Sequence, residues 1–211
     1  MNDSMKAGRA LVFDFGRVVF RWRPEVLVAE TLPHRAGDPE ATKHWTSHIF
    51  QAYEGDWQHF DRGTLEPPEL ARRIAARTGL TEDEVLAVVE ACPAELEPLP
   101  DTVAWLRRLH AQGKPLHYLS NMPEPFALHF ERTHDFMQFF ESGVFSSRAQ
   151  LVKPEPEIFT HAARVYRRPP GALLLIDDHL PNIVAARAAG WQAVHFDNVA
   201  QAQSEVEALG W

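Results

Sequence analysis

The sequence predicts an α/β fold: a doubly wound, parallel, Rossmann-like sheet into which a small all-helical cap is inserted. The chain beyond residue 100 alternates between short apolar segments and segments with helical spacing. This alternation implies parallel strands joined by helical crossovers. Residues 23–97 instead carry helical patterns almost without strand signals. We therefore expect a core of residues 1–22 and 98–211 and a helical cap of residues 23–97.

Length and charge limit the class of protein. The 211 residues, 45% of them hydrophobic, are enough for one core and a smaller unit. A net charge of -8 argues against a general affinity for nucleic acid or anionic membranes. Cys92 is the single cysteine, so no internal disulfide forms, and we find neither a secretion signal nor a membrane span. We expect a soluble cytoplasmic protein; the sequence indicates no oligomeric state.

The first strand, residues 10–13, is a short apolar segment followed by Asp14. Residues 16–22 are expected to form an extended flap, and Pro24 then begins a helical region, at a position where proline is tolerated. Further helices are expected in the cap at residues 38–50, 67–77 and 81–91. Thr81 and Glu84 form the pattern of a capping box, and Gly79 ends the helix before it.

The second half of the chain returns to the main body after a proline-containing hinge at residues 97–100. The expected strands are residues 116–119, 144–145, 172–176 and 192–196, and the expected helices are residues 101–112, 125–136, 155–167, 181–189 and 199–209. In an open α/β sheet, ligands bind outside the carboxyl ends of the strands. Polar residues at these strand ends are therefore the candidates for a functional site.

Four segments place such residues at one edge of the sheet. Asp14 and Ser120 each follow a strand, and Ser120 with the next backbone N–H can face an anion, although a helix cap is its ordinary role. Lys153 lies in a loop whose prolines fix its backbone, although such a lysine is usually solvated. The adjacent carboxylates of Asp177 and Asp178 repel each other unless a cation is present.

Together with Asp14, this acidic pair forms an oxygen-rich site that suits Mg²⁺. Asn182 falls in the first turn of the next helix, where it can orient the carboxylates. Each feature has an ordinary explanation by itself. Because all four segments follow strands or loops at the same edge, we expect them to form one site.

These residues resemble the four motifs of the haloacid dehalogenase-like hydrolase superfamily. The motifs are Asp14-Phe-Gly-Arg-Val18, Leu119-Ser-Asn121, Lys153-Pro-Glu-Pro156 and Ile176-Asp-Asp-His-Leu-Pro-Asn182. The helical insert resembles the small cap of the first subclass of that superfamily. With Phe60-Asp-Arg-Gly63 in the insert, the chain looks most like bacterial sugar-1-phosphate phosphatases related to the phosphatase domain of epoxide hydrolases.

The resemblance implies a magnesium-dependent phosphatase in which Asp14 attacks phosphorus and forms an aspartyl-phosphate, which water hydrolyses. Magnesium would be held by Asp14, the backbone carbonyl of Gly16 and Asp178, with Asp177 nearby. Ser120, the backbone of Asn121 and Lys153 would bind the phosphoryl oxygens. The expected substrate is a small phosphorylated metabolite, most simply a sugar phosphate.

One position departs from the family pattern. The family usually places a second aspartate two residues after the nucleophile, as the acid and base of the reaction, and this chain has Gly16 there. The glycine favours an easy leaving group, such as the anomeric oxygen of a sugar-1-phosphate. A cap histidine could replace the acid, and the candidates are His34, His48 and His59.

Three further residues are candidate substrate contacts: Arg17 beside the site, and His48 and Trp57 in the cap, which is expected to close over the site. Arg17 could equally point outward, and the cap aromatic residues could form the cap's own core. Two other functions stay open. A 2-haloacid dehalogenase would use Asp14 without a metal, and a catalytically impaired relative would only bind a phosphorylated ligand.

Overall fold

The computed structural model describes residues 8–211. The core is a five-stranded parallel sheet, as predicted, with the strand order β3-β2-β1-β4-β5. Its strands are β1 (Ala10–Phe13), β2 (Leu116–Ser120), β3 (Ser142–Phe145), β4 (Leu173–Asp177) and β5 (Gln192–His195). The strand order reverses beside β1, the first strand of the chain. The amino-terminal residues, on which the expectation of no secretion signal rests, lie outside the described residues.

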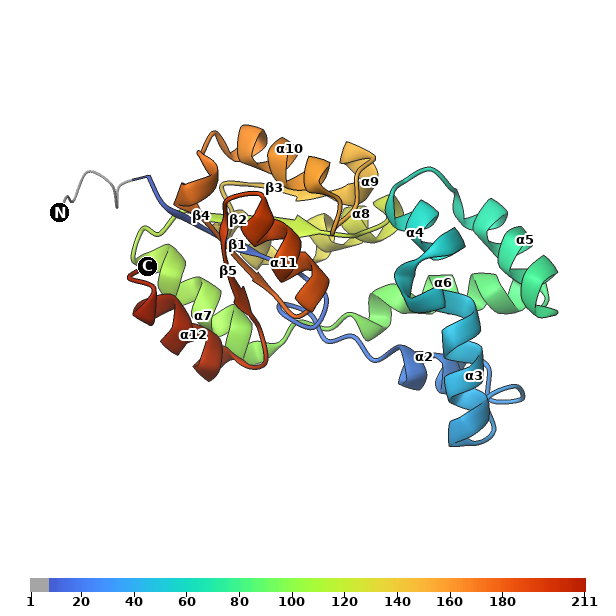
Figure 1. Cartoon of the computed structure of the whole chain (residues 1–211). Coiled ribbons are helices and arrows are strands. Elements are labelled where there is room, and N and C mark those ends of the chain that lie inside the picture. Colours follow the sequence, from blue (N-terminus) through green and yellow to red (C-terminus); the bar gives the residue numbers. More distant parts are fainter. Residues whose placement is uncertain (1–7) are drawn as a thin grey trace.

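Helices cover both faces of this sheet (Figure 1). Alternate residues of β1 point to opposite faces. Leu11 and Phe13 share one hydrophobic cluster with α7 (Pro100–Ala111), α8 (Glu124–Thr133) and α12 (Val199–Ala208). Ala10 and Val12 share a second cluster with α10 (Pro156–Tyr166) and α11 (Leu180–Ala188). Burial on both faces explains why β1 is a continuous apolar segment without alternation.

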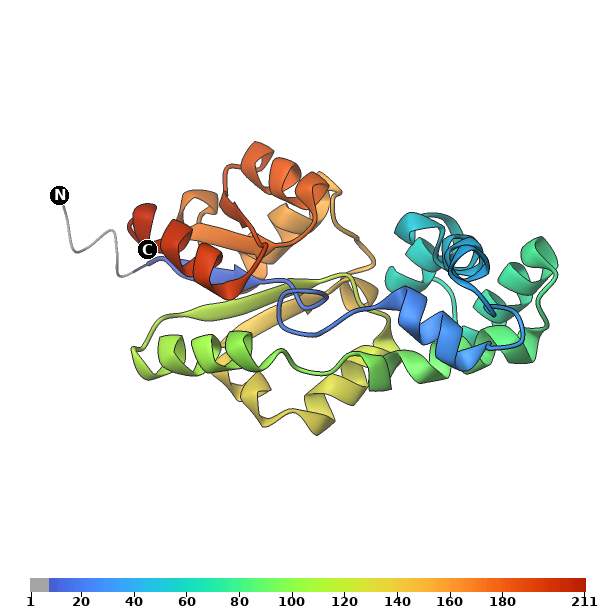
Figure 2. The ribbon, with the colours of Figure 1, turned by 90° about the horizontal axis from the view of Figure 1, so that it is seen from below.

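The helices of residues 24–95 lie together beside one end of the sheet (Figures 1 and 2). They are α2 (Pro24–Thr31), α3 (Pro39–Phe50), α4 (Gly55–Asp61), α5 (Pro67–Thr78) and α6 (Glu82–Glu95). The capping box at the start of α6 and the glycine that ends α5 both form as predicted. Short 3₁₀ turns, η1 (Gln51–Tyr53), η2 (Asp135–Phe139) and η3 (Pro170–Ala172), and the single-turn helix α9 (Ser146–Ala149) complete the described structure.

Helix α6 continues past the predicted end at residue 91 and contains Pro93. Glu95, in its last turn, is buried and forms ion pairs with Arg21 and Arg23, at 3.2 and 2.9 Å. These contacts, together with the buried side chain of Cys92, stabilise a turn that proline alone would disfavour. They also fasten the two chain segments that join the sheet to the helices of residues 24–95.

Residues 16–22 do not form the expected extended flap. The backbone N–H groups of Val19 and Phe20 both donate to the carbonyl of Phe15, at 2.9 and 2.8 Å, so the chain folds into a compact turn. The side chains of Val18, Val19 and Phe20 are fully buried. The turn is compact because burying these apolar side chains is more favourable than extending them into solvent.

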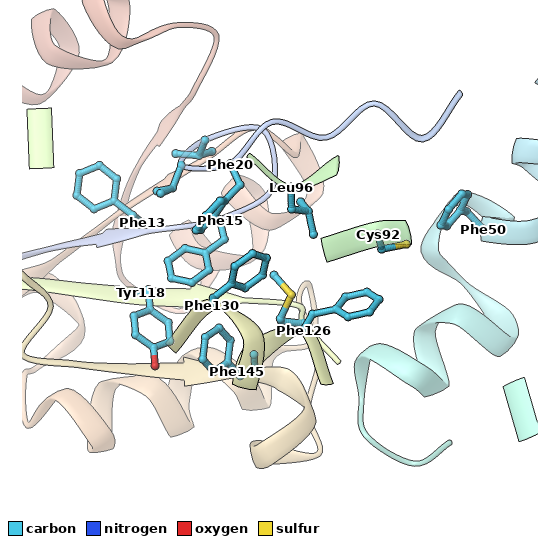
Figure 3. Close-up of a cluster of buried hydrophobic side chains, with 14 of the residues drawn as sticks. Phe13, Phe15, Phe20, Phe50, Cys92, Leu96, Tyr118, Phe126, Phe130 and Phe145 are labelled. Carbon is cyan, nitrogen blue, oxygen red and sulfur yellow. The ribbon is translucent and has the colours of Figure 1, made fainter. Parts of the chain in front are cut away.

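One hydrophobic cluster runs from the sheet into the neighbouring helices (Figure 3). Phe15 and Phe20 pack on Phe130, with ring centroids 6.3 and 4.4 Å away, and Phe126 and Leu96 continue the cluster toward α6 and α3. The two groups of helices therefore share one apolar core. Within residues 8–211, we find no helix of the length and apolar character that crossing a membrane requires.

Candidate active site

The four predicted segments meet at the carboxyl ends of β1, β2 and β4. Asp14 follows β1, Ser120 ends β2 and Asp177 ends β4, while Lys153 comes from the loop before α10. They lie at or directly behind the wall of a cavity of about 310 Å³. The parallel sheet explains this convergence, because the carboxyl ends of neighbouring parallel strands lie at one edge.

Lys153 is the centre of the site. Its Nζ lies 2.8 Å from Oδ1 of Asp14 and 2.6 Å from Oδ2 of Asp177, and its side chain is buried. The side chain of Asn121 holds the Lys153 backbone through two hydrogen bonds: its Nδ2 donates to the Lys153 carbonyl at 2.9 Å, and its Oδ1 accepts from the Lys153 N–H at 2.8 Å. Burial lowers the pKa of Lys153, but the charges of the two carboxylates outweigh burial and raise the pKa overall.

The two adjacent aspartates have different surroundings. Asp177 is fully buried behind Lys153 and also accepts hydrogen bonds from the backbone N–H of His179, at 2.8 Å, and from Nδ2 of Asn182, at 3.0 and 3.1 Å. Asp178 instead lines the cavity, where its Oδ2 lies 3.9 Å from Nη1 of Arg17. Asp177 therefore fixes Lys153, while Asp178 offers its carboxylate to the cavity.

The acidic residues of the site fit a divalent cation. Asp14, Asp177 and Asp178 each offer a carboxylate oxygen, and these oxygens all lie within 4.8 Å of one another. Burial raises the pKa of Asp14 to about 7; Lys153 opposes the rise and the two other carboxylates add to it. Burial and the charge of Asp177 also raise the pKa of Asp178. One ammonium group does not neutralise three carboxylates, and hard oxygen ligands of this kind suit Mg²⁺.

Most of the remaining predicted residues line the cavity, as expected. They are Gly16, Arg17, Ser120, Asn121 and Trp57. The side chain of Arg17 is nevertheless more than half exposed.

The three cap histidines do not line the cavity, so the structure does not bring them to the site. His48 Nδ1 lies 2.8 Å from the carbonyl of His44 in its own helix, and the two imidazole rings pack 4.0 Å apart. His34 pairs with Glu84 at 2.6 Å, and the ring of His59 contacts Thr64. The expectation that His48 contacts the substrate therefore disagrees with the structure, because its helix turns that ring away from the cavity.

Sequence reasoning missed an acid that the helices of residues 24–95 bring to the cavity. Asp61 is the last residue of α4, lines the cavity and is 6% exposed. It is part of the Phe60-Asp-Arg-Gly63 segment, which supported the family resemblance, but no function was predicted for its aspartate. A signal was present, because a carboxylate at a helix C-terminus is disfavoured by the helix dipole and needs another reason to be there.

The apolar part of the cavity wall was also missed. It comes from the segment after β1, the end of α6, the loop after β2 and the start of α8, and it includes Trp22, Leu96, Met122 and Phe126. Of the aromatic side chains in residues 23–97, the predicted Trp57 and also Tyr53 line the cavity. The cavity is thus polar at the strand ends and apolar toward the helices of residues 24–95.

A family model of haloacid dehalogenase-like hydrolases matches residues 9–190. The chain belongs to this family. Its match to the sesquiterpene phosphatase astK of Aspergillus oryzae is 26% identical over 188 residues, which are 89% of each protein. A phosphoglycolate phosphatase of Nitrosospira multiformis is 33% identical over 85 residues, or 40% of this chain and 37% of that enzyme. Membership of the family and these phosphatase relatives make the protein a hydrolase with relatives that cleave phosphate esters.

Solved structures support the same fold. A haloacid dehalogenase family enzyme of Bacteroides thetaiotaomicron, in complex with magnesium and inorganic phosphate, superimposes with a TM-score of 0.68 at 20% identity, over 88% of this chain and 92% of that chain. An L-2-haloacid dehalogenase of Xanthobacter autotrophicus, with chloropropionic acid covalently bound, superimposes with a TM-score of 0.67 at 17% identity, over 96% and 82% of the two chains. At these identities the similarity shows the fold alone.

Proposed function

We propose that the protein is a magnesium-dependent phosphomonoester hydrolase that acts on a small phosphorylated metabolite, with Asp14 as its nucleophile. One observation carries the proposal: an oxygen of Asp14 lies 2.8 Å from the buried Lys153 ammonium at a cavity, within an acidic cluster that fits a divalent cation. A phosphate dianion needs positive charge around it before a carboxylate can attack phosphorus.

The reaction would proceed in two steps. In the first, a carboxylate oxygen of Asp14 forms a bond to phosphorus, the bond from phosphorus to the ester oxygen breaks, and an aspartyl-phosphate results. In the second, water attacks phosphorus and releases inorganic phosphate, which regenerates Asp14. Ser120, the backbone N–H of Asn121 and Lys153 would bind the phosphoryl oxygens, where positive charge and donors stabilise the transition state.

Asp14, the carbonyl of Gly16 and Asp178 would hold magnesium, which when bound supplies positive charge beside the phosphoryl oxygens. Asp177 and Asn182 would keep Lys153 and the acidic cluster in place, since Asn182 donates to both oxygens of Asp177. This division of roles agrees with the exposure of the two neighbouring carboxylates. Only Asp178 of the pair faces the cavity.

We propose that residues 23–97 act as the cap of a first-subclass family member and select the substrate. A sugar phosphate is the first candidate substrate, since Trp57 lies in the cavity wall and could stack on a sugar ring. A sugar-1-phosphate would also need less help from an acid at position 16, because its anomeric oxygen leaves easily.

The apolar wall supports a second substrate class, the phosphate ester of a hydrophobic alcohol. Trp22, Leu96, Met122 and Phe126 could bury the apolar part of such a substrate. The relative with 89% coverage is a sesquiterpene phosphatase, which agrees with this possibility. Each Å² of apolar substrate surface that this wall removes from water would contribute about 25 cal/mol to binding, which favours the ester of a hydrophobic alcohol over a sugar phosphate.

The two other functions fit less well. A haloacid dehalogenase must bind a substrate that carries a carboxylate. The three aspartates beside Lys153 repel such an anion unless a metal is present, and a dehalogenase uses no metal. A catalytically impaired, ligand-binding protein would explain Gly16, but it would not explain why Asp14 is paired with the buried Lys153 at the cavity. We therefore propose the phosphatase.

The decisive experiment assays phosphate release from sugar-1-phosphates, sugar-6-phosphates and prenyl monophosphates, with magnesium and with a chelator. We expect metal-dependent release that Asp14→Asn abolishes while the variant keeps the wild-type melting temperature within a few degrees. Release that persists in Asp14→Asn would contradict the covalent role. Equal rates on sugar-1- and sugar-6-phosphates would remove the argument from the leaving group, and faster turnover of prenyl phosphates would select the second substrate class.

A further inference from the structure

Hydrolysis of an alkyl phosphomonoester needs a proton for the leaving oxygen, and Gly16 has no side chain to give one. Among the described residues, four titratable groups outside the acidic cluster and Lys153 could supply this proton at the cavity: Tyr53, Glu54, Asp61 and His179. Tyr53, Glu54 and His179 are exposed to solvent. Asp61 alone of the four is buried.

The carboxyl group of Asp61 is free to act. Among residues 8–211, it forms no hydrogen bond and no ion pair, although the residue is 6% exposed. It also lines the cavity that contains Asp14 and Lys153. The residue is largely removed from water, and its carboxyl oxygens, which are not fully enclosed, have no partner in the described part of the chain. This arrangement costs stability unless a group in the cavity pairs with them.

The backbone around Asp61 is fixed to the core. The hydroxyl of Ser146 donates to the carbonyl of Asp61 and accepts from the backbone N–H of Met122 at 2.8 Å. Ser146 thus joins the end of α4 to the loop that follows the Ser120 strand. This contact positions the Asp61 side chain relative to the phosphate site.

The next two residues contact the loop that carries Lys153 and the short helix α9 that precedes it. Nη1 of Arg62 donates to Oε2 of Glu155 at 2.8 Å and to the carbonyl of Gln150 at 3.2 Å. Gly63, with φ of +74°, approaches the backbone of Ser147 so closely that a Cβ there would lie 2.5 Å from the Ser147 carbonyl oxygen. The turn of residues 61–63 is therefore packed directly against residues 147–155, which include Lys153.

We propose that Asp61 is the general acid and base of the reaction, in the role that Gly16 cannot fill. This inference rests on the proposed phosphatase function. As Asp14 bonds to phosphorus and the ester bond breaks, the Asp61 carboxyl group gives its proton to the leaving oxygen, which departs as an alcohol. The Asp61 carboxylate then takes a proton from water as the water oxygen attacks phosphorus, and the electrons of the Asp14–phosphorus bond return to Asp14.

The titration of Asp61 agrees with this role. Burial raises the pKa of Asp61 to about 8; the charge of Asp14 adds to the rise and that of Lys153 opposes it. Tyr53 and Cys92 are the other titratable groups near enough to sense its charge. A carboxyl group that keeps its proton at neutral pH is in the form that the first step needs.

The experiment compares Asp61→Asn with the wild type on two probes of similar shape, 4-nitrobenzyl phosphate and 4-nitrophenyl phosphate, in the presence of magnesium. The benzyl alkoxide needs a proton in order to leave, and the nitrophenolate does not. We expect kcat for the benzyl ester to fall about 10²–10⁴-fold. With the phenyl ester, we expect a burst of one nitrophenolate per enzyme followed by slow turnover, since the base for the second step is missing.

Two further variants separate chemistry from structure. Asp56→Asn changes a carboxylate of the same helix that pairs with Arg77 at 3.4 Å outside the cavity, and it should show no burst. Gly16→Asp in the Asp61→Asn background should recover part of the benzyl ester rate. A Cβ at Gly16 would meet no atom within 4 Å, so the new side chain has space.

Three results would overturn the inference. One is an unchanged rate on the benzyl ester in Asp61→Asn. The second is an equal loss on both probes without a burst, which would indicate a structural role. The third is a double variant that is no faster than Asp61→Asn. A wild-type protein that hydrolyses neither probe nor any phosphate of the wider panel would overturn the proposed function itself, and the inference with it.

Discussion

Replacing Asp61 by asparagine should stabilise the metal-free protein at neutral pH while it impairs the proposed reaction. The folded protein raises the pKa of this carboxyl group from 3.8 to about 8, because the group is buried beside the charge of Asp14. Between these two pH values the folded state keeps a proton that the unfolded state has lost. Stability contributed by this group is therefore present below pH 4 and is lost as the pH rises toward 8.

The size of the effect follows from the pKa. One pKa unit corresponds to about 1.36 kcal/mol, so holding the Asp61 proton at pH 7 costs on the order of 4 kcal/mol, as an upper bound. Asparagine has nearly the same shape as protonated aspartic acid, but its side chain does not titrate, so the variant does not carry this cost. For a chain of this length, such a gain corresponds to a rise in Tm of roughly 10 °C.

The assay is thermal and urea unfolding of the wild type and Asp61→Asn in a chelator, at pH 4, 5, 6 and 7. The stability difference between Asp61→Asn and the wild type should change in favour of the variant from pH 4 to pH 7. Any effect of the substitution that does not depend on pH cancels in this comparison. A difference that stays constant from pH 4 to pH 7, or that shifts in favour of the wild type as the pH rises, would refute the reasoning.

Other variants test the site and the docked turn. Lys153→Met leaves buried carboxylates without their ammonium and should cost about 3–5 kcal/mol in urea unfolding with chelator, so an unchanged midpoint would contradict the described pairing. Gly63→Ala and Gly79→Ala both place alanine in the left-handed region, but only at Gly63 would the new Cβ meet backbone, that of Ser147. We expect Gly79→Ala to lower the free energy of unfolding by about 1 kcal/mol and Gly63→Ala to lower it clearly more. Equal losses in the two variants would contradict the close approach of Gly63 to Ser147.

The sheet and the strand-end residues could be predicted because their signals are local. β1 and β4 are buried on both faces, so each is a continuous apolar segment in the sequence, and a parallel sheet necessarily brings their carboxyl ends together. Asp14 and Asp177 follow from this geometry. Lys153 needed the resemblance to a family as well, since an isolated lysine in a loop is usually solvated.

The contributions of the helical region could not be predicted in the same way. His48 and Trp57 lie in neighbouring helices of that region, yet only Trp57 faces the cavity. The difference depends on how each helix is rotated against its neighbours, which a sequence pattern of mixed aromatic and polar residues does not fix. Asp61 depends on tertiary contacts that are remote in sequence, among them that of Ser146 with its carbonyl.

These contacts connect the chemistry to the position of the cap. Asp14 and Lys153 belong to the sheet and its loops, whereas Asp61 belongs to α4 in the helical region. The turn that carries Asp61 contacts the core at two places: Arg62 donates to Gln150 and Glu155 in the Lys153 loop, and Gly63 lies against the backbone of Ser147 in α9. In a chain with aspartate at position 16, the acid would instead follow β1, as Asp14 does. With Gly16, and if residues 23–97 act as the cap that we propose, the leaving oxygen would be protonated only while Asp61 faces the substrate, so the contacts of Arg62 and Gly63 with the core would also bring the acid to the site.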